Sequence, residues 1–242
     1  QYNAPKASTD TGSGAPIAAT ISDAAPPAGT SVDNAPSATN NAVPTDAKIQ
    51  DGAFATVKTD LFTAKISSVG GNLVELKLNS YKDRDDKTQA LMLLGDQHKY
   101  RAQSGLTSAE AGLLPDHNTL LQIEANKTDN VFELVEGQEA LQLKFFAPEK
   151  NGVKVTKIYS FKRGSYLMDV TYEIDNNSAQ AISPNAYFQL RRDGESPAGE
   201  SRMSSTYTGA AVYSAAEKYN KIKFDDIEKG KVKLPINMQD GW

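Results

Sequence analysis

The sequence predicts an all-β fold, an antiparallel sandwich of two sheets, on the basis of two observations. Beyond residue 50 the apolar residues recur with a period of two, which is typical of strands with one face on a core and the other in water. Short segments rich in Gly, Pro and Asn separate the alternating stretches every 10–14 residues. This spacing of turns is typical of a sandwich or a barrel.

The first predicted hairpin joins Phe62–Val69 to Asn72–Leu78 through Gly70 and Gly71. Glycine adopts the positive φ that tight turns need at little steric cost. In the second of these strands the apolar residues alternate with Glu75 and Lys77. A slip of one residue would move the whole apolar set into water, so the register is strongly specified.

Four further strands follow at the same spacing, and short turns join them. The expected strands are Glu139–Ala147, Val153–Phe161, Ser165–Asp175 and Gln180–Arg191. Ser183–Pro184 interrupts the last of them. Because proline cannot donate to a strand ladder, we expect an edge or a bulge there.

One short helix is expected near the C-terminus, over Ala215–Ile222 (215–222). Its residues are compatible with a helix, Ser214 is a candidate N-cap, and Glu217 stands at the third helical position. That arrangement is typical of a capping box.

The first fifty residues are predicted to be a flexible tether. They hold six of the eleven prolines and twelve alanines, and Tyr2 is their only aromatic residue. Such a composition cannot bury enough apolar surface to offset an ordering cost of about 1–2 kcal/mol per residue. The predicted organisation is therefore a tether over 1–50 and one β-sandwich domain over 51–242.

Charge and composition exclude several classes of function. The net charge is −4, and two lysines against four aspartates give the predicted tether −2 of it, so the domain is near −2. A nucleic-acid-binding domain is usually strongly basic, and the same balance argues against a polybasic contact with anionic lipid. The longest apolar run, Ala90–Leu94, is far shorter than the roughly 18 residues that span a bilayer. We therefore expect any membrane attachment to lie outside this chain.

No catalytic or metal-binding signature stands out. The chain has no cysteine and two histidines, His98 and His117, and neither lies in a recognisable motif, so we expect structural or surface roles for both. The acidic cluster Asp83–Asp86 lacks the spacing, the glycine and the terminal glutamate of a calcium loop. We therefore expect a solvated loop there, no metal, no cofactor and no catalytic residue.

Five strings in order resemble one known family. They are Val57-Lys58-Thr59-Asp60, then Gly70-Gly71, then 100–107, then 161–166, and finally the stretch 207–242 with Gly-Ala-Ala-Val-Tyr, Glu-Lys-Tyr, Lys-Phe and Gly-Trp. Together they resemble the large periplasmic domain of the YidC-type membrane protein insertases, over residues 55 to 242.

The resemblance implies a β-supersandwich similar to the sugar-mutarotase fold, on the periplasmic side of the bacterial inner membrane. It implies a non-catalytic accessory domain of a multi-pass protein that helps membrane proteins insert and fold, alone or with the Sec translocon. Family members have membrane helices and further strands of this domain beyond the stretch that matches. We therefore expect this chain to be a fragment, with membrane contact only through segments outside it.

Aromatic residues near the end of the chain are the candidate partner-binding residues. Interfaces favour Tyr and Trp because they bury a large area at little entropic cost. The resemblance implies that Sec accessory subunits lie near Ser204–Trp242, and that nascent membrane proteins are further partners. The candidates are Tyr207, Tyr213, Lys218, Tyr219, Phe224 and Trp242.

Two alternatives stay open. The first is a carbohydrate-binding or mutarotase-like envelope protein, which would need a groove lined with aromatic residues and paired carboxylates. The second is a general periplasmic holdase, which would need an exposed apolar groove for extended peptides.

Overall fold

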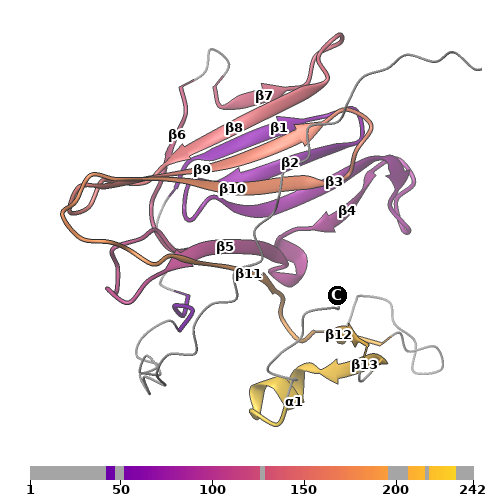
Figure 1. The fold of residues 1–242 in the computed structure, drawn as a ribbon. Coiled ribbons are helices and arrows are strands. Elements are labelled where there is room, and N and C mark those ends of the chain that lie inside the picture. The colour runs from indigo at the N-terminus through magenta and orange to yellow at the C-terminus, as the bar shows by residue number, and fades with distance from the viewer. Residues whose placement is uncertain (1–41, 47–51, 126–128, 196–206, 216–217, 233–242) are drawn as a thin grey trace, which may run out of the picture. The chain divides into compact units, whose positions relative to one another are not determined.

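A computed structural model of the chain describes residues 42–46, 52–125, 129–195, 207–215 and 218–232. The described residues are mostly strands, with one turn of 3₁₀ helix and one short α-helix (Figure 1). The elements are β1 Phe54–Lys58, β2 Phe62–Ser67, β3 Asn72–Lys82, β4 Ala90–Leu94, η1 Asp96–His98, β5 Arg101–Thr107, β6 Gln122–Ile123, β7 Val131–Glu133, β8 Ala140–Phe146, β9 Val153–Lys162, β10 Met168–Asn176, β11 Asn185–Arg191, β12 Gly209–Ser214, β13 Lys218–Lys223 and α1 Phe224–Glu228.

The strands form two main sheets and a separate hairpin. A seven-stranded sheet has the order β11-β5-β3-β2-β1-β7, with β4 also paired to β3. A four-stranded sheet has the order β10-β9-β8-β6, and β12 pairs with β13. Neighbouring strands are antiparallel except β1 and β7, which are parallel. The all-β sandwich predicted from the sequence is confirmed.

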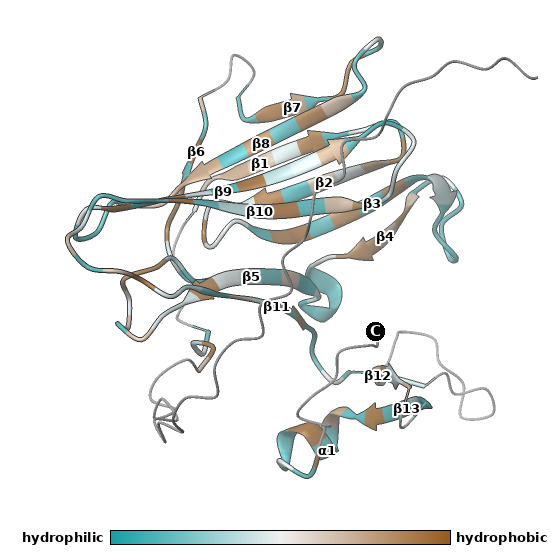
Figure 2. Cartoon of the chain, in the orientation of Figure 1, coloured by the Kyte–Doolittle hydropathy of each residue, from teal (hydrophilic) through white to brown (hydrophobic). Residues whose placement is uncertain are grey.

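The core lies between the two main sheets, and the hydropathy alternates along the strands that face it (Figure 2). Phe62 of β2 meets Phe161 of β9 with ring centroids 6.1 Å apart, and Tyr159 stacks on Phe161 at 6.2 Å. Each fully buried side chain of this kind contributes about 1.5–3 kcal/mol. Burial between two layers is therefore the main source of stability in the sandwich.

The strands predicted in this part of the chain are confirmed, with ends that shift by a few residues. The last of them begins only at Asn185, directly after Pro184, and β11 lies at the edge of its sheet. The interruption expected at Ser183–Pro184 therefore marks the start of an edge strand.

The turn between β2 and β3 forms hydrogen bonds with β9 of the other sheet. Gly70 and Gly71 have φ values of 65° and 59°, a region that glycine enters readily. The carbonyl of Gly70 accepts a hydrogen bond from Lys157 Nζ at 2.7 Å, and that of Gly71 accepts one from Tyr159 Oη at 2.6 Å. A Cβ on Gly70 would lie 2.2 Å from the carbonyl oxygen of His117. The close approach therefore requires glycine at this position.

The prediction of a helix over 215–222 is wrong. Residues 218–223 form strand β13, and the helix α1 starts only at Phe224. Ser214, expected as an N-cap, is the last residue of β12 and pairs with Lys218. Cross-strand pairing with β12 thus overrides the weak helical preference of this segment. Asp225 and Asp226 lie in the first turn of α1, where negative charge is favourable.

Of the predicted tether, the structure describes residues 42–46, of which Thr45 and Asp46 contact the sandwich. The remainder of the predicted tether lies outside the described residues. Within the described ranges, no helix has both the length and the apolar character needed to cross a membrane.

Candidate functional site

The candidate partner-binding residues cluster on the β12–β13 hairpin. Tyr213 lies directly opposite Tyr219, and Ala211 lies opposite Lys221. Because side chains alternate between the faces of a strand, Tyr213, Tyr219, Lys221 and Lys223 share one face of the hairpin. We call these four residues the aromatic–basic face.

The opposite face of the hairpin is partly buried. Ile222, which is 7% exposed, lies there opposite Ala210. Tyr219 on the aromatic–basic face is 53% exposed. The hairpin therefore buries its aliphatic side and presents tyrosine and lysine to solvent.

Tyr207 packs beside the aromatic–basic face. Its hydroxyl donates to the carbonyl of Ala210 at 3.0 Å, and Lys221 Nζ lies 5.0 Å from its ring centroid. Desolvation raises the pKa of Tyr207, and the nearby Tyr219 and Asp226 act in the same direction. The tyrosine–lysine contact is a cation–π pair, which strengthens when a partner excludes water.

The structure brings together three of the six candidates, Tyr207, Tyr213 and Tyr219. Lys218 lies on the other face of the hairpin, and Phe224 is the half-buried first residue of α1. Trp242 lies outside the described residues. Lys221 and Lys223 were not chosen from the sequence, although their period-two spacing from Tyr219 would have placed them with it in a strand.

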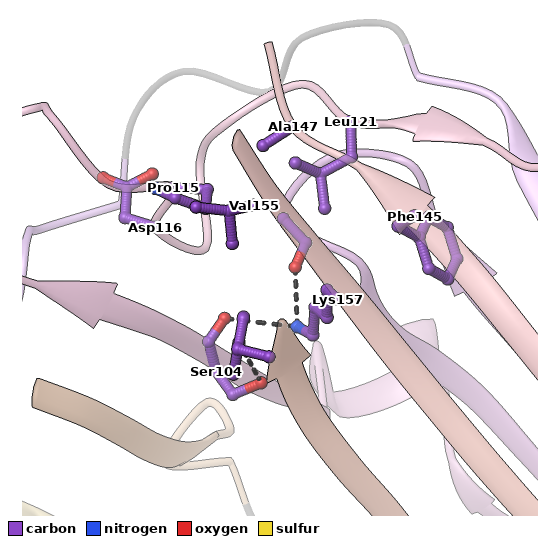
Figure 3. A pocket seen from close by; sticks show the side chains of 10 residues that line it. Ser104, Pro115, Asp116, Leu121, Phe145, Ala147, Val155 and Lys157 are labelled. Carbon is purple, nitrogen blue, oxygen red and sulfur yellow. Dashed lines mark hydrogen bonds between the residues drawn. The ribbon is translucent and has the colours of Figure 1, made fainter. Parts of the chain in front are cut away.

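A second polar centre lies inside the sandwich, around Lys157 of β9 (Figure 3). Its ammonium donates to the carbonyls of Gly70, at 2.7 Å, and Ser104, at 3.2 Å, and lies 5.7 Å from the ring centroid of Tyr172. Burial lowers the pKa of Lys157 to about 7. Lys157 is 2% exposed and its ammonium is already bonded to both carbonyls, so this lysine serves the contact between the sheets.

Both histidines have partners that the sequence did not reveal. His98 Nδ1 lies 3.2 Å from Asp193 Oδ1. His117 is 1% exposed, and its Nδ1 lies 2.6 Å from the hydroxyl of Tyr187. Asp116, its neighbour in sequence, instead accepts hydrogen bonds from its own turn, from the amide of Asn118 and the hydroxyl of Thr119.

The acidic loop at 83–86 uses its carboxylates locally. Asp83 accepts from the amides of Asp85 and Asp86, and Asp86 accepts from Thr88. These hydrogen bonds lower the pKa of Asp83 and of Asp86. Among the described residues, no three His, Asp or Glu side chains gather in a way that could hold a metal ion.

An apolar groove of about 600 Å³ opens between β10 and β11. Val170 and Ile174 line it on one side, and Leu106 and Phe188 line it on the other. Its lining contains no carboxylate and no histidine. The groove can therefore receive apolar side chains, and it lacks the paired carboxylates that the carbohydrate alternative would need.

Comparison with known proteins gives a consistent result. The family model of the YidC periplasmic domain matches residues 55–242. Proteins named membrane protein insertase YidC are 42% identical over 186 residues in Dechloromonas aromatica and 41% identical over 197 residues in Nitrosospira multiformis. These matches cover 77% and 81% of this chain and 33% of each relative. The relative in Janthinobacterium sp. is 35% identical over 238 residues, covering 98% of this chain and 40% of its own length.

The fold and these matches define the class of this chain: it is an extracytoplasmic β-sandwich domain of the kind found in membrane protein insertases. The chain belongs to the family of YidC periplasmic domains, and its place is the periplasmic side of the bacterial inner membrane. It spans about a third of the length of the curated relatives it matches.

Proposed function

We propose that this chain is a non-catalytic interaction domain of an insertase that assists the insertion and folding of membrane proteins. The aromatic–basic face of the β12–β13 hairpin is the observation that carries the proposal. It combines an exposed tyrosine with two lysines and a cation–π pair, a composition that suits the anchor of a protein interface.

Two further observations support a non-catalytic role. The most reactive side chains inside the sandwich, Lys157 and His117, are enclosed and already hydrogen-bonded. The carboxylates of Asp83 and Asp86 are held by their own turn. General acid–base catalysis needs such groups within reach of a substrate.

The proposed partners are nascent membrane proteins and accessory subunits of the Sec translocon. The apolar groove between β10 and β11 favours a second candidate function, a holdase that takes up extended, unfolded segments. Phe188, which lines the groove, is among the most exposed large apolar side chains in the described part of the chain.

Photo-cross-linking in a full-length insertase that carries this chain tests both candidates. A benzophenone amino acid replaces Tyr219 on the aromatic–basic face, Phe188 in the groove, or Asn220 as a control. Asn220 is exposed and neighbours Tyr219, but it points to the other face of the hairpin.

We expect adducts with a Sec accessory subunit or a nascent chain from position 219 and few from position 220. Adducts with many unrelated clients from position 188 alone would support the holdase instead. Equal yields from 219 and 220 would refute the hairpin as the contact surface.

A further inference from the structure

The carboxylate of Asp46 is held by three side chains of the sandwich. Its Oδ1 lies 3.0 Å from His117 Nε2, and it accepts a hydrogen bond from Gln103 Nε2 at 3.2 Å. Its Oδ2 forms an ion pair with Arg191. The three partners come from β5, β11 and the loop that precedes β6, so a single acidic residue joins three separate segments.

The arrangement keeps a proton on His117 Nε2. The hydroxyl of Tyr187 accepts a hydrogen bond from the His117 backbone amide at 3.0 Å and meets Nδ1 at 2.6 Å. Burial raises the pKa of Tyr187 to about 12, so the phenol proton stays in place. A neutral imidazole that accepts this proton at Nδ1 must carry its own at Nε2, and an imidazolium carries one there as well. In both forms Nε2 carries a proton and lies 3.0 Å from Asp46 Oδ1, without the alignment of a hydrogen bond.

Neighbouring hydrogen bonds orient the remaining contacts of this segment. The buried amide of Gln103 accepts from Gln189 Nε2 at 2.8 Å, which fixes the side on which it donates. One residue before Asp46, the carbonyl of Thr45 accepts from Asn118 Nδ2 at 3.0 Å. The Arg191 guanidinium and the Gln103 amide nitrogen can only donate, so the site suits a carboxylate, which accepts through both of its oxygens.

We propose that His117, Gln103 and Arg191 form a carboxylate-binding site on the seven-stranded sheet, with Asp46 as its resident ligand. Residues 42–46 are then a strap that fastens the chain to the β5–β11 side of the sheet, ahead of β1. A force on the preceding residues acts on this ionic contact before it reaches the β1–β2 pair. The site thus protects the sheet from being peeled open at its first strand.

Site-directed spin labelling of the full chain tests the strap. The chain has no cysteine, so Val43→Cys gives a single attachment point at an exposed position of the strap. We expect an immobilised spectral component in the otherwise unchanged chain and its loss in Asp46→Ala. Asp96→Ala, which removes an exposed carboxylate in η1, serves as the control and should keep the component.

Chemical rescue tests the site itself. Sodium acetate should raise the melting temperature of Asp46→Ala in a saturable way, relative to sodium chloride at equal ionic strength. The melting temperature of the unchanged chain should be the same in both salts. If the mobility of the label at position 43 is the same with and without Asp46→Ala, the proposed strap is refuted. An acetate response equal in both proteins would overturn the carboxylate site.

Discussion

The sandwich and the β12–β13 hairpin follow the same period of two, yet they bury different things. In the sandwich, each apolar face meets a second layer, and Phe161 is completely buried. In the hairpin, Ile222 is buried on one side while Tyr219 and its lysines face solvent on the other. A two-stranded hairpin on its own is marginally stable in water. Alternation therefore specifies a strand, but only a facing layer turns that alternation into stability.

The largest expected effect comes from the sandwich core. Phe161→Ala removes a ring that packs on Phe62 and Tyr159 and should lower the free energy of unfolding by about 3–5 kcal/mol. Urea denaturation measures the loss. Leu167→Ala, at a position 76% exposed, is the control and should change stability by less than about 0.5 kcal/mol.

A smaller effect should come from Lys157, through pH. Its pKa is about 7 in the folded chain and about 10.4 when unfolded, so the unfolded state binds more protons between these values. Stability should therefore rise with pH in this window, by roughly 2 kcal/mol between pH 7 and pH 9. The raised pKa of Tyr172, about 12, acts oppositely, but only above pH 10, where the folded state holds its proton longer.

The comparison of Lys157→Met with Lys154→Met isolates this contribution. Lys154 lies on the same strand, but its side chain is 59% exposed. Urea midpoints at pH 7 and pH 9 should converge for Lys157→Met and keep the original difference for Lys154→Met. Identical pH dependence in both variants would show that the buried ammonium does not titrate in this range.

The smallest effect on stability should come from the hairpin surface. Tyr219→Ala removes an exposed side chain and should change the free energy of unfolding by no more than about 0.5 kcal/mol. Its effect on cross-linked or co-purified partner should be much larger, because exposed tyrosines contribute to binding rather than to folding. Thermal melts and a pull-down from detergent-solubilised membranes measure the two quantities. A large drop in melting temperature without loss of partner would contradict this division of roles.

The sequence predicted the strands of the sandwich because their alternation reflects burial directly. It failed for the helix predicted over 215–222, because residues 218–222 are held in a strand by pairing with β12. The placement of Lys157 was open to prediction, since it falls at an inward position of β9 between Val155 and Tyr159. Its acceptor carbonyls were not, because Ser104 lies in a strand of the other sheet and Gly70 lies in the turn between β2 and β3.

The hairpin site and the Asp46 site also differ in how far they could be predicted from the sequence. Tyr213 and Tyr219 are six residues apart, and a correct strand assignment would have paired them. Asp46 and His117 are 71 residues apart, and nothing in their local sequence marks the contact. Only the folded arrangement of β5 and β11 brings the donors around that carboxylate.

The two-glycine turn between β2 and β3 has a consequence for how this domain can vary. A hairpin turn is usually among the most variable parts of a protein, because it lies at the surface and touches little. Here the carbonyls of Gly70 and Gly71 accept hydrogen bonds from Lys157 and Tyr159. A methyl group on Gly70 would also collide with the main chain at His117. Insertions, deletions and larger residues should be tolerated at the other hairpin turns long before they are tolerated at this one. A mutational scan would find the least replaceable dipeptide of the domain in a loop.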